Sequence, residues 1–69
     1  MTEVRLSVNG ESRVIPGPAT LHDLLEHLSL DARMVVVELN REIIRRGRLD
    51  QLTLKDGDAV ELVHFVGGG

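Results

Sequence analysis

The alternating segment at residues 4–8, followed by Asn9-Gly10, is the feature that most restricts the fold. Apolar and polar side chains take turns along it, which is typical of a strand with one buried face. Asn and Gly accept the positive φ angles of a two-residue type I′ turn, so a second strand at residues 12–15 is expected to return antiparallel. Pro16-Gly17-Pro18 is expected to end that strand, because proline donates no ladder hydrogen bond. The sequence thus predicts a β-hairpin.

One amphipathic helix is expected after the hairpin. Its apolar stripe follows the spacing i, i+3, i+4, i+7 and consists of Leu21, Leu24, Leu25 and Leu28. Thr20 and Asp23 match a capping box, in which each side chain accepts a hydrogen bond from the backbone N–H of the other residue. The polar side of the helix contains His22, Asp23, Glu26 and His27. We expect the leucine stripe to cover one face of the sheet.

Three further strands are predicted in the second half of the chain. Residues 34–40, MVVVELN, are rich in β-branched side chains, with Val35, Val37 and Leu39 on one face and Val36 and Glu38 on the other. Ile43-Ile44 is interpreted as a brief strand, residues 45–54 as a loop with a helical turn, and KDGD at 55–58 as a turn. The last strand is predicted at residues 59–66.

This order of elements predicts an α+β architecture. One main helix lies on one face of a mixed sheet of about five strands, with the first and last strands adjacent in the middle, which is a β-grasp (ubiquitin-like) fold. We expect a single domain at residues 1–66, because 69 residues hold only one core, and a flexible glycine tail at 67–69. The expected core between helix and sheet is Val4, Leu6, Val8, Leu21, Leu24, Leu25, Leu28, Val35, Val37, Leu39, Val60 and Leu62.

The composition argues against several classes of function. The chain has no cysteine, and therefore no thiol nucleophile, disulfide or thiolate metal site. A net charge of −3 and a single aromatic residue, Phe65, argue against binding to nucleic acid. The strand pattern starts within four residues of Met1, which leaves no room for a signal peptide, and no apolar run reaches membrane-spanning length. A cytoplasmic location and no membrane partner are expected.

Catalytic or metal chemistry is not expected either. His22 and His27 are about 140° apart around a helix, too far to share one ion. His64 is expected to be partly buried and neutral, and Asp56-Gly57-Asp58 to be a turn that lacks the further ligands of a calcium loop. The sequence shows no defensible Ser, His and acid set and no glycine-rich phosphate loop. We therefore predict a protein that is not an enzyme and that binds no metal or cofactor.

The three glycines at the end of the sequence are the remaining chemical feature. Gly67 and Gly68 follow the last predicted strand directly, so the carboxylate of Gly69 stands on a stem without side chains. Such a stem fits a narrow active-site channel, because glycine adopts almost any φ and ψ. A frayed end or an expression remnant is the alternative interpretation. We interpret the Gly69 carboxylate as a group on which another enzyme acts.

These motifs resemble the ThiS sulfur carriers of thiamine biosynthesis, within the ubiquitin-like group that includes MoaD. The likeness extends over the whole chain: the VNG hairpin, the helix TLHDLLEHL, the segment VVVELNREII and the final LKDGDAVELVHFVGGG. The sequence departs from many relatives at IIRRGRLDQ, where they have a proline after the short strand and Arg46 or Gly47 stands here.

The resemblance implies a protein co-substrate. An E1-like adenylating enzyme of the ThiF type uses ATP and magnesium to join AMP to the Gly69 carboxylate. Sulfur that derives ultimately from cysteine then displaces AMP, and a thiazole synthase of the ThiG type consumes the thiocarboxylate. Three alternatives stay open: a MoaD-like carrier for molybdopterin synthesis, a ubiquitin-like binding module whose tail is never activated, and a modifier that is joined to target lysines.

A docking surface is predicted on the face of the sheet opposite the helix. If Val60 and Leu62 face the core, the two-residue period of the last strand puts Val63 and Phe65 on the other face with Glu61, beside Val36 and Glu38. Aromatic anchors rimmed by charge are typical of interface centres. We predict that the partner contacts Phe65, Val63, Val36 and Val66. Scattered surface hydrophobes, or apolar groups covered by a loop, are the alternative.

Overall fold

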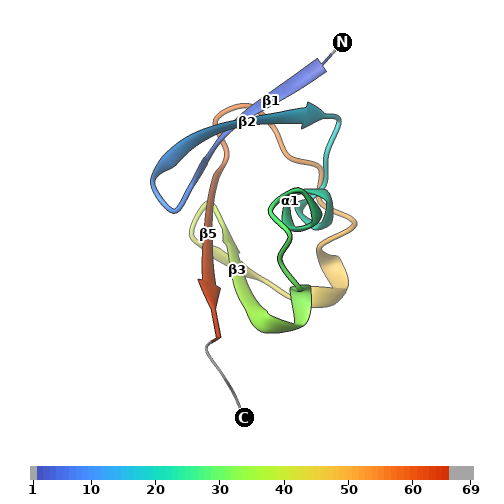
Figure 1. Cartoon of the computed structure of the whole chain (residues 1–69), viewed down its shortest axis with the longest axis vertical. Coiled ribbons are helices and arrows are strands. Elements are labelled where there is room, and N and C mark those ends of the chain that lie inside the picture. The colour runs from blue at the N-terminus through green and yellow to red at the C-terminus, as the bar shows by residue number, and fades with distance from the viewer. Residues whose placement is uncertain (1, 66–69) are drawn as a thin grey trace.

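The computed structural model describes residues 2–65 and shows one α-helix against a five-stranded sheet (Figure 1). The elements are β1 (Thr2–Val8), β2 (Glu11–Gly17), α1 (Leu21–His27), the 3-10 turn η1 (Ala32–Met34), β3 (Val35–Leu39), β4 (Glu42–Ile44), the 3-10 turn η2 (Arg46–Arg48) and β5 (Ala59–His64). The predicted helical turn in the loop is thus η2. Residues 66–69 lie outside the described part, and with them the predicted last residue of the final strand and the predicted flexible tail.

The sheet has the strand order β2-β1-β5-β3-β4. β1 and β5 pair in parallel, whereas the other three pairings are antiparallel. β5 therefore occupies the middle of a mixed sheet with β1 beside it. This topology confirms the predicted β-grasp fold.

The opening hairpin is confirmed, with a longer second strand than predicted. Asn9 and Gly10 form the turn with φ angles of 50° and 83°. β2 continues to Gly17 and includes Pro16, which pairs with Glu3. The expectation that Pro16 ends the strand was wrong, because β2 is an edge strand and an N–H that faces away from the sheet is not needed there. Gly17 is required by space, since a Cβ on it would lie 2.7 Å from Cγ2 of Val4.

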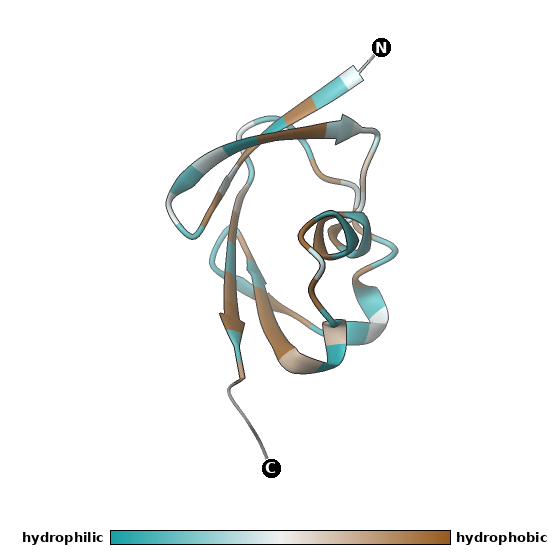
Figure 2. Cartoon of the chain, viewed as in Figure 1, coloured by the Kyte–Doolittle hydropathy of each residue, from teal (hydrophilic) through white to brown (hydrophobic). Residues whose placement is uncertain are grey.

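The helix begins at the predicted capping box. The Asp23 N–H donates to Thr20 Oγ1 at 3.1 Å, and the Thr20 N–H donates to Asp23 Oδ2 at 2.9 Å. α1 is brown on the side that faces the sheet and teal on the other side in Figure 2. Leu21, Leu24 and Leu25 are completely buried, whereas Leu28, at the C-cap, is half-buried.

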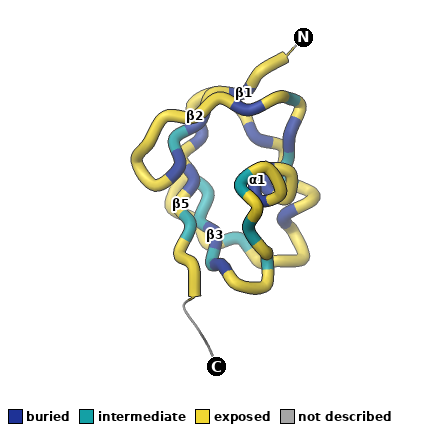
Figure 3. Tube along the Cα trace, viewed as in Figure 1, coloured by how far each residue is buried: buried dark blue, intermediate teal, exposed yellow. Residues whose placement is uncertain are grey.

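The core lies between α1 and the inner face of the sheet (Figure 3). Of the residues expected there, Leu28, Leu39 and Leu62 are half-buried at its margin, and the others are buried. The sequence analysis missed four buried apolar residues, which are Ile15, Ala19, Leu49 and Leu54. Leu49 and Leu54 belong to the loop between β4 and β5, and backbone hydrogen bonds connect this loop to the helix region. The His22 N–H donates to the Leu49 carbonyl, and the Leu54 N–H donates to the Ala19 carbonyl.

The KDGD turn is confirmed, and both of its carboxylates accept backbone N–H groups. Asp56 Oδ1 accepts from Arg5 at 2.8 Å, and Asp58 Oδ2 accepts from Lys55 at 2.8 Å. Asp58 is buried and also accepts from Asn40 Nδ2 at 3.1 Å. These hydrogen bonds give the two aspartates a structural role, because they hold the turn against β1 and fix the chain just before β5 begins.

Candidate functional site

The end of β5 is the candidate site, because this strand leads to Gly69. All five residues of β3 pair with this strand, from Leu39 opposite Val60 to Val35 opposite His64. Beyond the strand, the Phe65 N–H donates to the Met34 carbonyl at 2.8 Å. The last described residue is therefore still held by hydrogen bonding to the same side of the sheet.

The outer face at this end of the sheet exposes apolar side chains. Val63 is 59% exposed and Phe65 is 50% exposed. Val36 stands directly opposite Val63 and is half-buried. The structure thus brings together three of the four residues that were predicted to contact a partner, while Val66 lies outside the described residues.

Two carboxylates border this apolar surface. Glu38 and Glu61 are directly opposite each other on β3 and β5, one half-buried and one exposed. Like charges in such a pair repel each other when no cation lies between them. A basic side chain of a bound partner would remove that repulsion.

Ile43 belongs to the same face and was missed by the sequence analysis. It is 67% exposed, and it stands opposite Glu38 in the pairing of β3 with β4. The register follows from the two-residue turn Asn40-Arg41, whose φ angles are 51° and 72°. In the sequence only Asn40 indicated this turn, because arginine rarely adopts a positive φ. We call Val36, Ile43, Val63 and Phe65 the outer apolar surface.

His64 differs from its expected environment. It was predicted to be partly buried, but it is exposed. The side chain lies at the rim of a shallow hollow of about 340 Å³ whose lining also includes Leu28, Leu30 and Leu62. Along this face of β5 the side chains change from buried at Val60 to half-buried at Leu62 and exposed at His64.

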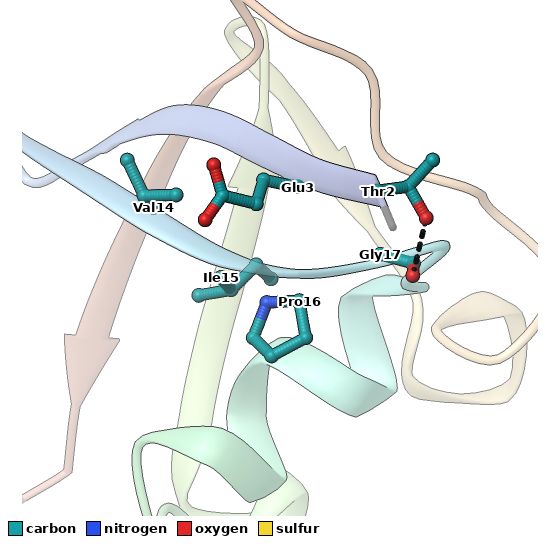
Figure 4. A pocket seen from close by; sticks show the side chains of 6 residues that line it. All are labelled: Thr2, Glu3, Val14, Ile15, Pro16 and Gly17. Atoms are coloured by element: carbon teal, nitrogen blue, oxygen red, sulfur yellow. Dashed lines mark hydrogen bonds between the residues drawn. The ribbon is translucent and has the colours of Figure 1, made fainter.

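Another open hollow, of about 610 Å³, lies at the far end of the hairpin (Figure 4). Its lining consists of Thr2, Glu3, Val14, Ile15, Pro16 and Gly17. Thr2 Oγ1 donates to the Gly17 carbonyl at 2.7 Å, and Glu3 supplies the only ionisable side chain of the lining. The hollow offers no arrangement of groups for catalysis, and its lining belongs to β1 and β2 and not to β5.

Three ionisable residues of α1 lie close together on its exposed side. Potential ligand atoms of His22, Asp23 and Glu26 lie within 4.8 Å of one another. All three side chains are exposed, and the Asp23 carboxylate already accepts the Thr20 N–H of the capping box. His27 is not a member of this group, which agrees with its predicted separation from His22.

Within the described residues, no helix is both long and apolar enough to cross a membrane.

Comparison with known proteins places the sequence. The family model described as the ThiS family matches residues 6–69. The chain belongs to the ThiS family. Its sequence is 48% identical over 50 residues to the sulfur carrier protein ThiS of Bacillus subtilis, a match that covers 72% of this chain and 76% of that one. The ThiS resemblance proposed from the motifs is thereby confirmed.

A solved ThiS structure supports the fold as well. The crystal structure of a thiamine biosynthesis protein (ThiS) from Geobacter metallireducens matches with a TM-score of 0.80 and 42% identity, over 96% of this chain and all of that one. The ThiS-like sequence also occurs within longer proteins. A thiazole synthase of Paramagnetospirillum magneticum is 41% identical over 66 residues, and this chain spans only 20% of its length.

Proposed function

We propose that this chain is a sulfur carrier protein of thiamine biosynthesis, whose Gly69 carboxylate is converted to a thiocarboxylate. The observation that supports this most directly is the ThiS family match, which runs through to Gly69. The relative from Bacillus subtilis has the name sulfur carrier protein, and its match to this chain supports the same role. The protein is then a co-substrate, and the catalytic groups belong to its partners.

Activation proceeds in two steps in this proposal. A carboxylate oxygen of Gly69 attacks the α-phosphorus of ATP on an E1-like enzyme of the ThiF type, with magnesium, and pyrophosphate leaves. The resulting acyl adenylate has a good leaving group, so a sulfur nucleophile derived from cysteine adds to the acyl carbon and AMP leaves. The carboxyl carbon is not oxidised or reduced, because one oxygen is replaced by sulfur.

A thiazole synthase of the ThiG type is the proposed acceptor of the sulfur. Support comes from two relatives named thiazole synthase, from Paramagnetospirillum magneticum and Magnetococcus marinus, which each contain a segment that matches 66 residues of this chain. Fusion of a carrier to the enzyme that uses it raises the effective concentration of the carrier.

The outer apolar surface is the proposed docking site for the activating enzyme. Phe65 is the only aromatic residue of the chain, is half exposed, and stands four residues before Gly69. Such a residue contributes most when it enters an apolar pocket of the partner. Glu38 and Glu61 border the surface, so the matching site on the partner is expected to contain a basic side chain.

Mass spectrometry tests the proposed function directly. After incubation with a ThiF-type enzyme, ATP, magnesium and a sulfur source, the intact protein should gain about 16 Da, because sulfur replaces oxygen. An unchanged mass would favour a binding module whose tail is not activated. Conjugation to lysine would instead give a product whose mass is the sum of two proteins minus water. Supply of the thiocarboxylate to thiazole synthase and to molybdopterin synthase in parallel separates the ThiS role from the MoaD-like alternative.

A further inference from the structure

Three exposed arginines follow β4, in and just before the turn η2. They are Arg45, Arg46 and Arg48, and we call them the basic surface. Residues 41–48 contain four arginines and one glutamate, whereas the rest of the chain contains four basic and ten acidic side chains. The net charge is −3, so half of the basic residues are concentrated in a short segment of an otherwise acidic molecule.

The backbone of η2 holds these arginines in a fixed arrangement. The Arg48 N–H donates to the Arg45 carbonyl at 2.9 Å, which closes the turn between them. Leu49, the next residue, is 2% exposed, and its carbonyl accepts the His22 N–H at 3.0 Å. The turn is thus anchored to the core and to α1, while the three arginines stay exposed.

The basic surface forms no ion pair with the described part of the chain. Within residues 2–65, the two ion pairs belong to Arg13 and Arg33. The hydrogen bonds from Arg33 are the main cause of the lowered pKa of Asp31, and the positive charge of Arg46 is a smaller one. Arg46 therefore lies near the start of η1 without pairing there. The guanidinium groups of the basic surface are available to a partner.

The basic surface lies at the end of the molecule where β5 ends. β4 and β5 are both antiparallel to β3 and therefore run in the same direction, with Ile44 and Leu62 both opposite Val37. Figure 1 shows η1 and η2 at the same end of the molecule as the end of β5. The Met34 carbonyl in η1 accepts the Phe65 N–H at 2.8 Å, which connects this end of β5 to η1.

An enzyme that acts on Gly69 has to approach this end of the protein. Phe65 is four residues before Gly69, and four residues span at most about 13 to 14 Å. The part of the enzyme around its active site is thereby brought close to η1 and η2. Charged groups on that part of the enzyme then lie within reach of the basic surface.

We propose that the basic surface docks against an acidic protein surface on the enzyme that adenylates Gly69. The proposal rests on the proposed function of this chain. Closely spaced guanidinium groups form charge-assisted hydrogen bonds with carboxylates, and such complementarity speeds association. A nucleic acid is a poorer match, because its continuous negative charge would also meet the acidic remainder of the molecule.

The charge on the outer face of the sheet has the opposite sign. Glu38 and Glu61 require a basic group on the partner, whereas the basic surface requires an acidic one. A partner with both groups in the right places can bind in only one orientation, because the reversed orientation brings like charges together. The two charged regions therefore help to direct Gly69 toward the active site.

Two triple variants separate the position of the charge from its amount. The first neutralises the basic surface by Arg45→Gln, Arg46→Gln and Arg48→Gln. The second is the matched control, changes exposed residues near the start of β5, and consists of Arg5→Gln, Arg41→Gln and Lys55→Gln. Both variants lower the net charge by the same amount. A third variant, with lysine at all three positions of the basic surface, keeps the charge, and circular dichroism checks that every variant is folded.

Surface plasmon resonance with a ThiF-type enzyme gives the association and dissociation rate constants. At low salt, the variant without the basic surface should associate about tenfold more slowly than the unaltered protein, because charges at the border of an interface act mainly on association. The control and the lysine variant should associate at close to the unaltered rate. The difference should shrink at about 1 M salt, where the Debye length is about 3 Å. In adenylation, followed as pyrophosphate release, kcat/KM should fall with the association rate while kcat stays the same.

The outcomes separate this docking role from the proposed function. If the unaltered protein is neither bound nor adenylated, the proposed function and the docking role are both rejected. If the unaltered protein reacts but the two glutamine variants associate equally fast, only the docking role is overturned. An effect that persists unchanged at 1 M salt would overturn the acidic partner surface. Loss of binding to a ThiG-type thiazole synthase or to a short single-stranded RNA, with normal association to the ThiF-type enzyme, would assign the basic surface to that other partner.

Discussion

Val36 and Val63 stand directly opposite each other in the antiparallel pairing of β3 with β5, on the face of the sheet away from α1. Val63 is 59% exposed, and Phe65, one residue beyond β5, is 50% exposed. Apolar groups that are exposed together on neighbouring strands lose contact with water when a partner covers them. This relationship is the basis of the docking prediction.

Phe65→Ala should weaken binding to the activating enzyme without unfolding the protein. The expected loss is about 1 to 3 kcal/mol, the range of an ordinary interface anchor. Isothermal titration calorimetry with the ThiF-type enzyme measures it. Val14→Ala is the control, because Val14 is an exposed apolar residue on the edge strand β2. Equal effects of the two substitutions, or unfolding by Phe65→Ala with unaltered binding of the folded fraction, would move the docking site elsewhere.

Leu25→Ala should destabilise the fold strongly. Leu25 is 1% exposed at the centre of the leucine stripe, and removal of a buried leucine side chain costs about 2 to 5 kcal/mol. Leu28→Ala should cost less, because Leu28 is only half-buried at the helix C-cap. Urea denaturation gives both values. Equal midpoints for Leu25→Ala and the unaltered protein would show that the helix packs through another stripe.

The length of the terminal segment should decide sulfur transfer. Deletion of Gly69, or addition of one residue after it, displaces the reacting carboxyl carbon by about 3.3 to 3.6 Å, the span of one residue. We expect either change to abolish the mass gain, since group transfer requires close alignment of the reacting atoms. The thermal midpoint should stay the same, which separates loss of reaction from loss of fold. Normal sulfur uptake by either variant would contradict a fixed reaction distance.

The carboxyl group of Asp31 should titrate at unusually low pH. The Arg33 guanidinium, with Nη2 at 2.8 Å from Asp31 Oδ2, and then the Arg33 backbone N–H lower the pKa of Asp31 from 3.8 to about 2. Because the folded state has the lower pKa, the pair stabilises the fold above about pH 3.8, and this contribution is lost as the pH falls through about 2. NMR titration of the Asp31 carboxyl carbon measures the pKa.

Arg33→Gln provides the test of that cause. It removes the guanidinium and keeps the backbone N–H, which donates to Asp31 Oδ1 at 2.8 Å. The pKa of Asp31 should therefore rise only part of the way toward its ordinary value. A pKa that stays at about 2 in the variant would show that the backbone N–H alone is responsible.

Local patterns in the sequence predicted much of the architecture. The Asn9-Gly10 turn, the capping box at Thr20 and the leucine stripe each depend on residues that are neighbours along the chain, and the structure confirms all three. The period of β5 placed Val63 on the outer face, where it is exposed, because alternate side chains of a strand point to opposite faces, and Phe65, one residue beyond the strand, is exposed as well. The family followed from the same motifs.

Other features depended on contacts between distant parts of the chain. Leu49 and Leu54 lie in a segment without a period, and they are buried only because the loop folds against α1 and Ala19. His64 is exposed although it lies on the same side of β5 as the buried Val60, and Ile43 reaches the outer face through the register of β4.

The sequence by itself determined the elements, their inward faces and the family of this protein, because these follow from neighbouring residues and motifs. Only the tertiary structure decided which backbone groups the side chain of Asn9 contacts. Asn9 and Leu62 are 53 residues apart in the chain, and their two hydrogen bonds require β1 and β5 to lie side by side in a fixed register. Asn9 can form the hairpin turn whether or not its side chain has such a partner, so the sequence predicts the turn but not the contact with Leu62.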